Sequence, residues 1–397
     1  MEQSTIKKPF VYIFLFLMTE FFLIMYIFLS NQQWFTITAD GKLYLNLAEN
    51  FVEGHGLINT IRKEDIIVPP LFALFLAPFV LLFKSEAPYF IFQYILYGLN
   101  SLLLFVISIK LFKSKAIGVL TTFMYAVHPV ILLNGPQFLL TETIFITFIL
   151  IVCYLSILWL KQDSSNYFYY LMIILSLSLL FRPHLMYVFG IVLVYHIWLV
   201  VKKKLKIITA AAYLIPLLFL LLNGLHNQWL HGEFVLLENY SGQNLYLANN
   251  PNTSVEFYAS TRIDRFVGPE YETYKDYPLS EKSKLLKEKA IDYMIHNPIE
   301  TIKRLILKSL LFFKGISVLD WILLFVSVVG WILAFIFDRE NRHIHLFLLL
   351  FIAGFAGLTS AGLLVGGQRY RTPIIPVYLL YGGFCLLGAR LLSKQRQ

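Results

Sequence analysis

Long apolar runs separated by short polar segments dominate the chain from Phe10 to near its last residue. Most runs are long enough for a helix to cross the hydrocarbon core of a bilayer. The ten runs that we expect to span the membrane cover residues 10–30, 88–109, 116–134, 142–160, 167–182, 184–201, 207–225, 317–337, 346–365 and 373–391. The pattern therefore predicts an all-α polytopic membrane protein with about ten transmembrane helices.

Residues 68–83 form a shorter apolar block that opens with Pro69-Pro70. If this block does not cross the membrane, most short-loop lysines and arginines fall on the cytoplasmic side, including the cluster from Lys202 to Lys206. If the block crosses, that cluster lies outside, against the positive-inside rule. We therefore expect 68–83 to lie at the outer face. Both termini are then cytoplasmic, and the first apolar run is a retained helix, since it lacks a small-residue cleavage site.

Two further stretches predict amphipathic helices on the outer side, at 281–297 and 299–314. The second places isoleucines and leucines on one face and lysines and an arginine on others, as expected of an interfacial helix. The chain then divides into three parts: an N-terminal transmembrane catalytic module over 1–225 with a first outer loop at 31–87, an outer loop with amphipathic helices over 226–316, and C-terminal transmembrane helices over 317–397.

Composition agrees with this class and excludes others. Of the 397 residues 58% are hydrophobic and only 14% are charged, whereas a soluble domain carries about 25% charged residues. The net charge of +9 resides mostly in short loops, where orientation in the bilayer explains it, so no nucleic-acid partner is predicted. Cys153 and Cys385 both fall inside apolar runs, which argues against a disulfide framework or a zinc site.

The segment from Asp40 to Leu57 follows the first apolar run and has helical periodicity. Asp40 occupies the position expected of an N-cap, and Gly54 and Gly56 end the pattern as helix stops. Two interpretations follow. The segment is a capped helix along the membrane surface, or Asp40 is a carboxylate held at the membrane edge as a catalytic base.

The predicted topology gathers further polar residues on the outer side. Arg182 stands in an otherwise apolar hairpin, and Arg369 and Arg371 together break the positive-inside trend, which an anionic partner would explain. Glu142 begins a span, where a helix N-terminus also favours an acid. No spacing typical of a metal site occurs, so no cofactor is predicted and a divalent cation stays an open alternative. Asp40 and Glu142 are the candidate catalytic residues, and the candidate binding residues are Tyr44, His55, Arg62, Lys63, Arg182, His184, Gln243, Asn244, Arg369, Tyr370 and Arg371.

Several short motifs follow one another along the chain. They are D-x-x-x-Y-x-x-x-A…G-x-G from Asp40, PPLFALFLAPF, LLTE ending at Glu142, Arg182-Pro183, GQNLYLANNP and RYRTPIIP. Their order resembles that of membrane glycosyltransferases of the GT-C fold, and it is most similar to the family 39-like group that includes protein mannosyltransferases and the aminoarabinose transferase of lipid A. The resemblance implies a catalytic Asp40 and a polyprenyl-phosphate sugar donor. Leu43 and Val68 depart from it, since some members carry Arg and Lys there.

These observations favour an inverting glycosyltransferase in the cell membrane. It would move a sugar from a polyprenyl-phosphate carrier to a glycan, lipid or protein acceptor on the outer face, among membrane lipids. A carboxylate would deprotonate the acceptor hydroxyl, and arginines would stabilise the departing phosphate. A nucleotide-sugar donor is disfavoured because no P-loop or Rossmann glycine pattern occurs. The alternative is a lipid or sugar transporter or flippase without transferase activity, but no internal repeat supports it.

Overall fold

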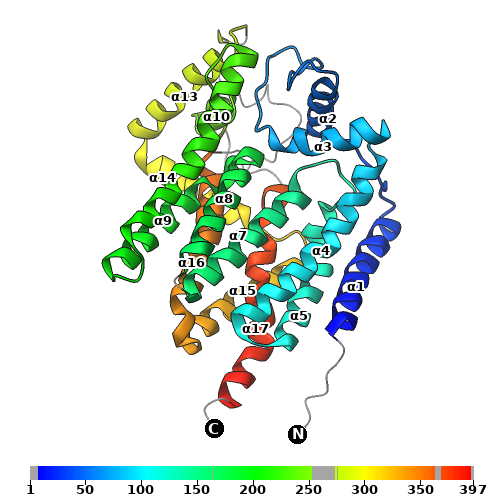
Figure 1. Ribbon diagram of the computed structural model, residues 1–397, viewed down its shortest axis with the longest axis vertical. Helices are drawn as coiled ribbons and strands as arrows, with labels where there is room; N and C mark the ends of the chain where they lie inside the picture. The colour runs from blue at the N-terminus through cyan, green and yellow to red at the C-terminus, as the bar shows by residue number, and fades with distance from the viewer. Residues whose placement is uncertain (1–7, 163, 253–272, 275, 363–367, 395–397) are drawn as a thin grey trace.

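The computed structural model describes residues 8–162, 164–252, 273–274, 276–362 and 368–394 (Figure 1). Within these ranges the chain is helical without strands, apart from a single bridge between Thr36 and Phe138. The α-helices are α1 Lys8–Leu29, α2 Ala39–Val52, α3 Leu71–Phe83, α4 Ala87–Phe112, α5 Lys115–Ala126, α6 Pro129–Leu133, α7 Glu142–Gln162, α8 Ser165–Phe181, α9 Met186–Val201, α10 Leu214–His231, α11 Ser241–Ala248, α13 Leu279–His296, α14 Pro298–Phe312, α15 Val318–Phe337, α16 Arg342–Gly362 and α17 Ile375–Lys394. Short 3-10 helices include η1 Pro183–Leu185, η2 Ile207–Tyr213, η5 Gln368–Tyr370 and η6 Thr372–Ile374.

Seven helical stretches in the described part of the chain are long and apolar enough to cross a membrane: Phe10–Leu29, Ala87–Phe112, Glu142–Gln162, Pro183–Val201, Ile207–His231, Val318–Phe337 and Arg339–Gly362. They confirm the predicted all-α polytopic membrane protein. The predicted spans at 116–134, 167–182 and 373–391 are not among the seven, and they form α5 with α6, α8 and α17.

The prediction of one continuous helix over 116–134 is wrong. Helix α5 ends at Ala126, and α6 begins at Pro129. His128 between them has an extended backbone with φ −70° and ψ 119°, because the proline ring restricts the residue before it. The interruption turns the His128 side chain into the core, where it is fully buried.

Large apolar side chains cover the outside of the bundle on several helices. Phe28 of α1, Val201 of α9, Leu214 of α10 and Phe325 of α15 are all more than half exposed. A soluble monomer rarely exposes a continuous apolar surface of this extent. The pattern suits contact with lipid chains.

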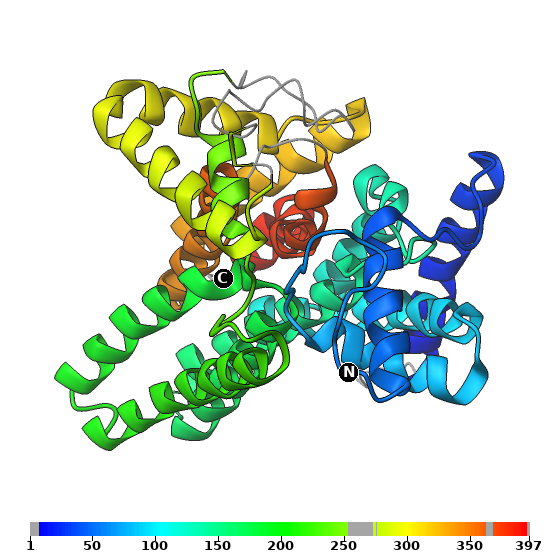
Figure 2. The same cartoon turned by 90° about the horizontal axis from the view of Figure 1, so that it is seen from above.

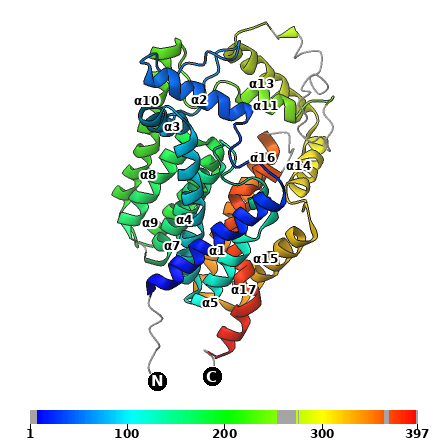
Figure 3. The same ribbon diagram turned by 90° about the vertical axis from the view of Figure 1, so that its right-hand side faces the viewer.

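The described ends of the chain, at α1 and α17, lie at one end of the molecule, and α2, α3 and α13 lie at the other (Figures 1 and 3). Helix α3 runs across the long axis in Figure 1. Its 13 residues give a length of about 20 Å, short of a hydrocarbon core of about 30 Å. That residues 68–83 do not cross the membrane stays a prediction. We call the end that carries α2 and α13 the site end.

The predicted amphipathic helices are present as α13 and α14, which meet at Asn297-Pro298. On α14 the isoleucine face, including Ile302 and Ile306, is exposed. Arg304 and Lys308 point inward and are buried. The helix therefore turns its apolar side outward and two of its cations, Arg304 and Lys308, toward the protein, whereas Lys303 is exposed.

Helix α17 lies at the centre of the bundle when the molecule is seen from the site end (Figure 2). Helix α15 packs along it. At Gly330 the two backbones approach so closely that a Cβ would collide with the carbonyl oxygen of Tyr381. This contact fixes α17, and hence the turn that precedes it, against α15.

The predicted topology can be tested with single cysteines at two exposed lysines, Lys202 after α9 and Lys289 on α13. Because the inner loops should collect the lysines, an impermeant maleimide added outside intact cells should label Lys289→Cys and leave Lys202→Cys unlabelled. Permeabilised cells provide the control, since both variants should then react. Equal labelling of both sites in intact cells would contradict the topology.

A candidate active site of alternating carboxylates and arginines

Two connecting segments pair side by side just before α2 and α7. The Thr36 amide donates to the carbonyl of Gln137 at 2.8 Å, and the Leu139 amide donates back to the Thr36 carbonyl at 2.9 Å. One turn later, a Cβ on Gly41 would lie 2.5 Å from the Leu139 carbonyl oxygen, so this approach requires glycine. The pairing brings together the first turns of α2 and α7, which carry Asp40 and Glu142.

The prediction that Asp40 is the N-cap of its helix is wrong. Thr38 is the N-cap, and its hydroxyl oxygen accepts from the Gly41 amide at 3.0 Å. Asp40 lies in the first turn of α2, where the helix dipole stabilises a negative charge. Its carboxylate is therefore available for contacts outside the helix. The predicted helix stops are confirmed, because Gly54 and Gly56 follow α2 with φ of 86° and 85°.

Asp40 and Glu142 belong to a row of alternating charges that we call the ion chain: Arg62, Asp40, Arg369, Glu142 and Arg182. Arg369 is its centre, donating to Asp40 Oδ2 at 2.9 Å and to Glu142 Oε1 at 2.7 Å. Arg182 lies 3.2 Å from the same Glu142 oxygen. Arg62 lies 3.7 Å from the other oxygen of Asp40. Five residues from separate parts of the sequence thus meet at one place.

Local sequence explains the place of Arg182 in this row. Pro183 follows it, so Arg182 adopts an extended backbone with φ −154° and ψ 129° and ends α8. Its guanidinium lies over the ring of Phe145 at 5.6 Å. The aromatic face and Glu142 together hold the guanidinium in position.

The two carboxylates of the ion chain differ in environment. The Glu142 side chain is 2% exposed and is shared by two arginines, whereas that of Asp40 is 48% exposed. Burial alone lowers the pKa of the Arg369 guanidinium, but the adjacent Glu142 and Asp40 outweigh it and raise the pKa. Arg369 is therefore always charged. Glu142 is thus enclosed between two arginines, whereas the Asp40 carboxylate keeps an exposed side.

Several buried polar atoms beside the ion chain have no hydrogen-bond partner in the described structure. They are Thr141 Oγ1, Glu142 Oε2 and His184 Nδ1. Buried polar atoms in proteins are normally paired. These three atoms are therefore available for hydrogen bonds beside the two arginines.

Three further groups near the ion chain include two that the sequence analysis missed. Burial raises the pKa of Tyr44 to about 12, although Arg182 opposes this, so its hydroxyl stays a hydrogen-bond donor at neutral pH. Burial also raises the pKa of the Glu238 carboxyl and of the Tyr240 hydroxyl bonded to it. Glu238 and Tyr240 follow α10 in an irregular segment with no periodic signal.

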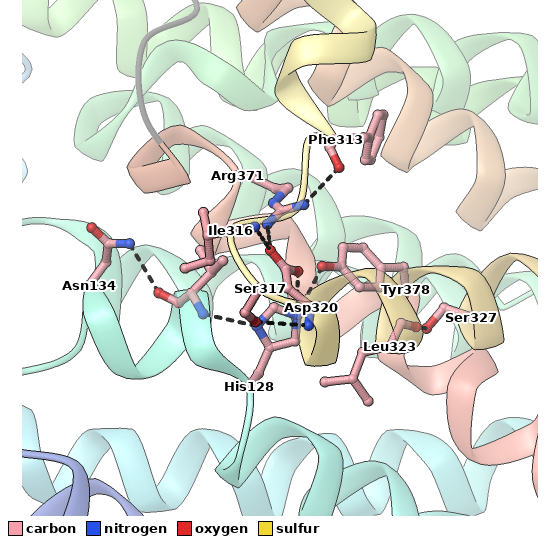
Figure 4. Close-up of polar contacts among 11 residues, drawn as sticks. His128, Asn134, Phe313, Ile316, Ser317, Asp320, Leu323, Ser327, Arg371 and Tyr378 are labelled. Atoms are coloured by element: carbon pink, nitrogen blue, oxygen red, sulfur yellow. Dashed lines mark hydrogen bonds and ion pairs between the residues drawn. The ribbon is translucent and has the colours of Figure 1, made fainter. Parts of the chain in front are cut away.

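Arg371 does not join the ion chain. Its side chain is fully buried and donates to Asp320, and to the Phe313 carbonyl at 3.0 Å (Figure 4). Asp320 Oδ1 also lies 3.5 Å from His128 Nε2, and the Tyr378 hydroxyl lies 3.2 Å from the same nitrogen. We call Arg371, Asp320, His128 and Tyr378 the Arg371 cluster.

The other predicted binding residues lie at varied distances along the site end. Arg62 also donates to the Ala39 carbonyl at 3.4 Å, which ties its loop to α2. His55 is exposed in the glycine turn, 3.6 Å from Glu53, and Lys63 is exposed. Gln243 and Asn244 lie on α11, which packs against α13 and α16. Tyr370 packs against the main core. Within the described ranges no group of three or more His, Cys, Asp and Glu side chains could hold a metal ion.

Comparison with known families supports a GT-C glycosyltransferase-like membrane protein, the class that the motifs resemble. Residues 68–229 match the family described as dolichyl-phosphate-mannose-protein mannosyltransferase. In general terms the match supports a membrane glycosyltransferase that uses polyprenyl-phosphate sugar donors. The matched stretch is less than half of the chain, and it contains Glu142 and Arg182 but not Asp40 or Arg369. No curated protein matches the chain.

The contrast between the two carboxylates predicts different effects on stability. Glu142→Gln should lower the free energy of unfolding by about 3 kcal/mol, the low end for breaking a buried ion pair, because two arginines lose their shared counter-charge. Asp40→Asn should change it by at most about 1 kcal/mol, since this carboxylate is half exposed. Thermal unfolding of both variants in one detergent measures the difference. Equal shifts would contradict the assigned roles.

Proposed function

We propose that the protein is an inverting glycosyltransferase. It moves a sugar from a polyprenyl-phosphate carrier to a glycan, lipid or protein acceptor at the outer face of the cell membrane. The observation that supports this best is the ion chain, in which Arg369 joins Asp40 to Glu142 between two further arginines. A base for the acceptor and cations for the departing phosphate are the parts that this transfer needs.

Asp40 is the proposed general base. Its carboxylate is half exposed and lies at the N-terminus of α2, outside the bundle core. Arg369 and Arg62 fix its orientation through one oxygen each. An acceptor hydroxyl approaching the exposed side would give its proton to Asp40 while its oxygen attacks the anomeric carbon.

Arg182 and Arg369 are the proposed cations for the carrier phosphate. A guanidinium presents five N–H donors, and the contacts with Glu142 and Asp40 use only some of them. The remaining donors are fixed in orientation before the ligand arrives, which is the arrangement that stabilises charge developing on a leaving group. The unpaired atoms of Thr141 and His184 supply further polar contacts beside them.

Under this proposal, Glu142 orients the two arginines, Arg182 and Arg369. It was predicted as a second catalytic carboxylate, and its burial supports a different contribution. One of its oxygens is engaged by both guanidinium groups. A carboxylate in that position compensates their charge and fixes their separation, so that the phosphate meets them in one geometry.

The role of Asp40 can be tested by Asp40→Asn, which keeps the volume and leaves the N-cap to Thr38. The variant should accumulate like the wild type, and its kcat should fall by about 10²–10⁴-fold, the usual contribution of a general base. Glu49→Gln, an exposed acid on the same helix, is the matched control and should retain activity. Wild-type turnover by Asp40→Asn would refute the role.

The donor class can be tested with the purified protein in lipid vesicles and a mixture of candidate acceptors. Sugar should pass from a polyprenyl-phosphate sugar and not from the corresponding nucleotide sugar, because the phosphate-binding groups are arginine side chains without a P-loop or Rossmann glycine pattern. Radiolabelled sugar in each donor form provides the measurement. Transfer from the nucleotide form in the absence of any lipid-linked sugar would end the proposal.

A further inference from the structure

The Arg371 cluster lies next to the ion chain along the backbone. Arg371 is two residues beyond Arg369, in the turn between η5 and η6. Its amino groups are held on two sides, by the Asp320 carboxylate and by the Phe313 carbonyl at 3.0 Å. Figure 4 shows the guanidinium between these two groups, where α14, α15 and the turn meet.

Asp320 is itself fixed from several directions. The Ile316 amide donates to Asp320 Oδ2 at 2.9 Å, the oxygen that also binds Arg371. Ser317 is the N-cap of α15, and its hydroxyl oxygen accepts from the Asp320 amide at 3.2 Å. His128, at the break between α5 and α6, approaches the other carboxylate oxygen at 3.5 Å. Asp320 is therefore held by the Ile316 amide and by the start of α15 independently of Arg371.

The ion pair between Asp320 and Arg371 lies away from water. Asp320 and Arg371 are both completely buried. A buried ion pair adds little net stability compared with an apolar pair, because both charges lose their hydration. Its value lies in fixing one geometry, and here the geometry is that of the turn carrying Arg369.

We propose that Asp320 is a positioning residue for the transfer reaction. By holding Arg371, it fixes the turn so that the Arg369 guanidinium reaches Asp40 and Glu142 at the same time. Asp320 touches no ligand and acts only through Arg369. The inference rests on the proposed function for its kinetic consequence, and it has a structural consequence that does not depend on activity.

The kinetic test is a double-mutant cycle in proteoliposomes with Asp320→Asn, Arg369→Lys and the double variant. Displacement of Arg369 by about 1 Å should reduce kcat/KM for the lipid-linked donor by about 100-fold in Asp320→Asn. Once Arg369→Lys has removed the positioned guanidinium, adding Asp320→Asn should change kcat/KM by no more than about twofold. Independent, multiplying effects of the two substitutions would overturn the proposal, because a merely structural role predicts them.

The activity-independent test measures how fast phenylglyoxal modifies Arg369, followed by peptide mass spectrometry. Release of Arg369 from its two carboxylates should speed its modification in Asp320→Asn. Asp338→Asn is the matched control, because Asp338 lies at the opposite end of α15 and pairs with His345 at 3.2 Å. Its rate at Arg369 should equal that of the wild type.

The two tests separate the two proposals. Faster modification of Arg369 in Asp320→Asn, with no sugar transfer by the wild type from any lipid-linked donor, supports the positioning role and refutes the proposed function. Transfer by the wild type with unchanged Arg369 modification in Asp320→Asn refutes the positioning role alone.

Arg371→Lys supplies a rescue variant. It keeps a cation beside Asp320, so its loss of activity should be smaller than that of Asp320→Asn.

Discussion

The bridge that Arg369 makes between Asp40 and Glu142 is the constraint on which the site end depends. It joins a helix at the start of the chain to one in the middle through a turn near the end. Each carboxylate stands at a helix N-terminus, where the dipole favours its charge. Without the arginine, two acids so close together would repel each other, and one of them would be buried without compensation. The pairing of Thr36 with residues 137–139 brings these two acids together, and Arg369 supplies the opposite charge.

Much of the fold could be predicted from the sequence because a bilayer allows few solutions. A backbone in hydrocarbon must satisfy its own hydrogen bonds, so each apolar run of sufficient length becomes a helix. The prediction of one span over 116–134 is wrong, because apolar composition does not show the break before Pro129. Pro129 breaks that run and leaves two helices, neither of which is long enough to span. Hydropathy indicates whether a segment favours the membrane, and local backbone constraints such as proline determine whether its helix is continuous.

The sequence predicts only those residues of the candidate site that have an unusual charge for their position in the chain. Arg182 and Arg369 stand out in the sequence because they break the predicted positive-inside pattern, and both lie in the ion chain. The same signal selected Arg371, which the structure places against Asp320 instead. Two arginines separated by one residue differ only in which way the turn points them, and that depends on contacts with distant helices. Asp320 gave no signal of its own, because an acid in the first turn of a helix is common.

The inverted amphipathicity of α14 has a consequence for depth. Its outward isoleucines and leucines are stabilised by contact with hydrocarbon. Their position therefore determines the depth of this helix in the bilayer. The Phe313 carbonyl, which directly follows α14, is bonded to Arg371. The contact of α14 with the lipid chains therefore also determines the depth of the turn that carries Arg369 and Arg371. The phosphate of a lipid lies at a fixed depth relative to the same lipid chains. The depth of the arginine turn and the depth of a lipid phosphate therefore share one reference.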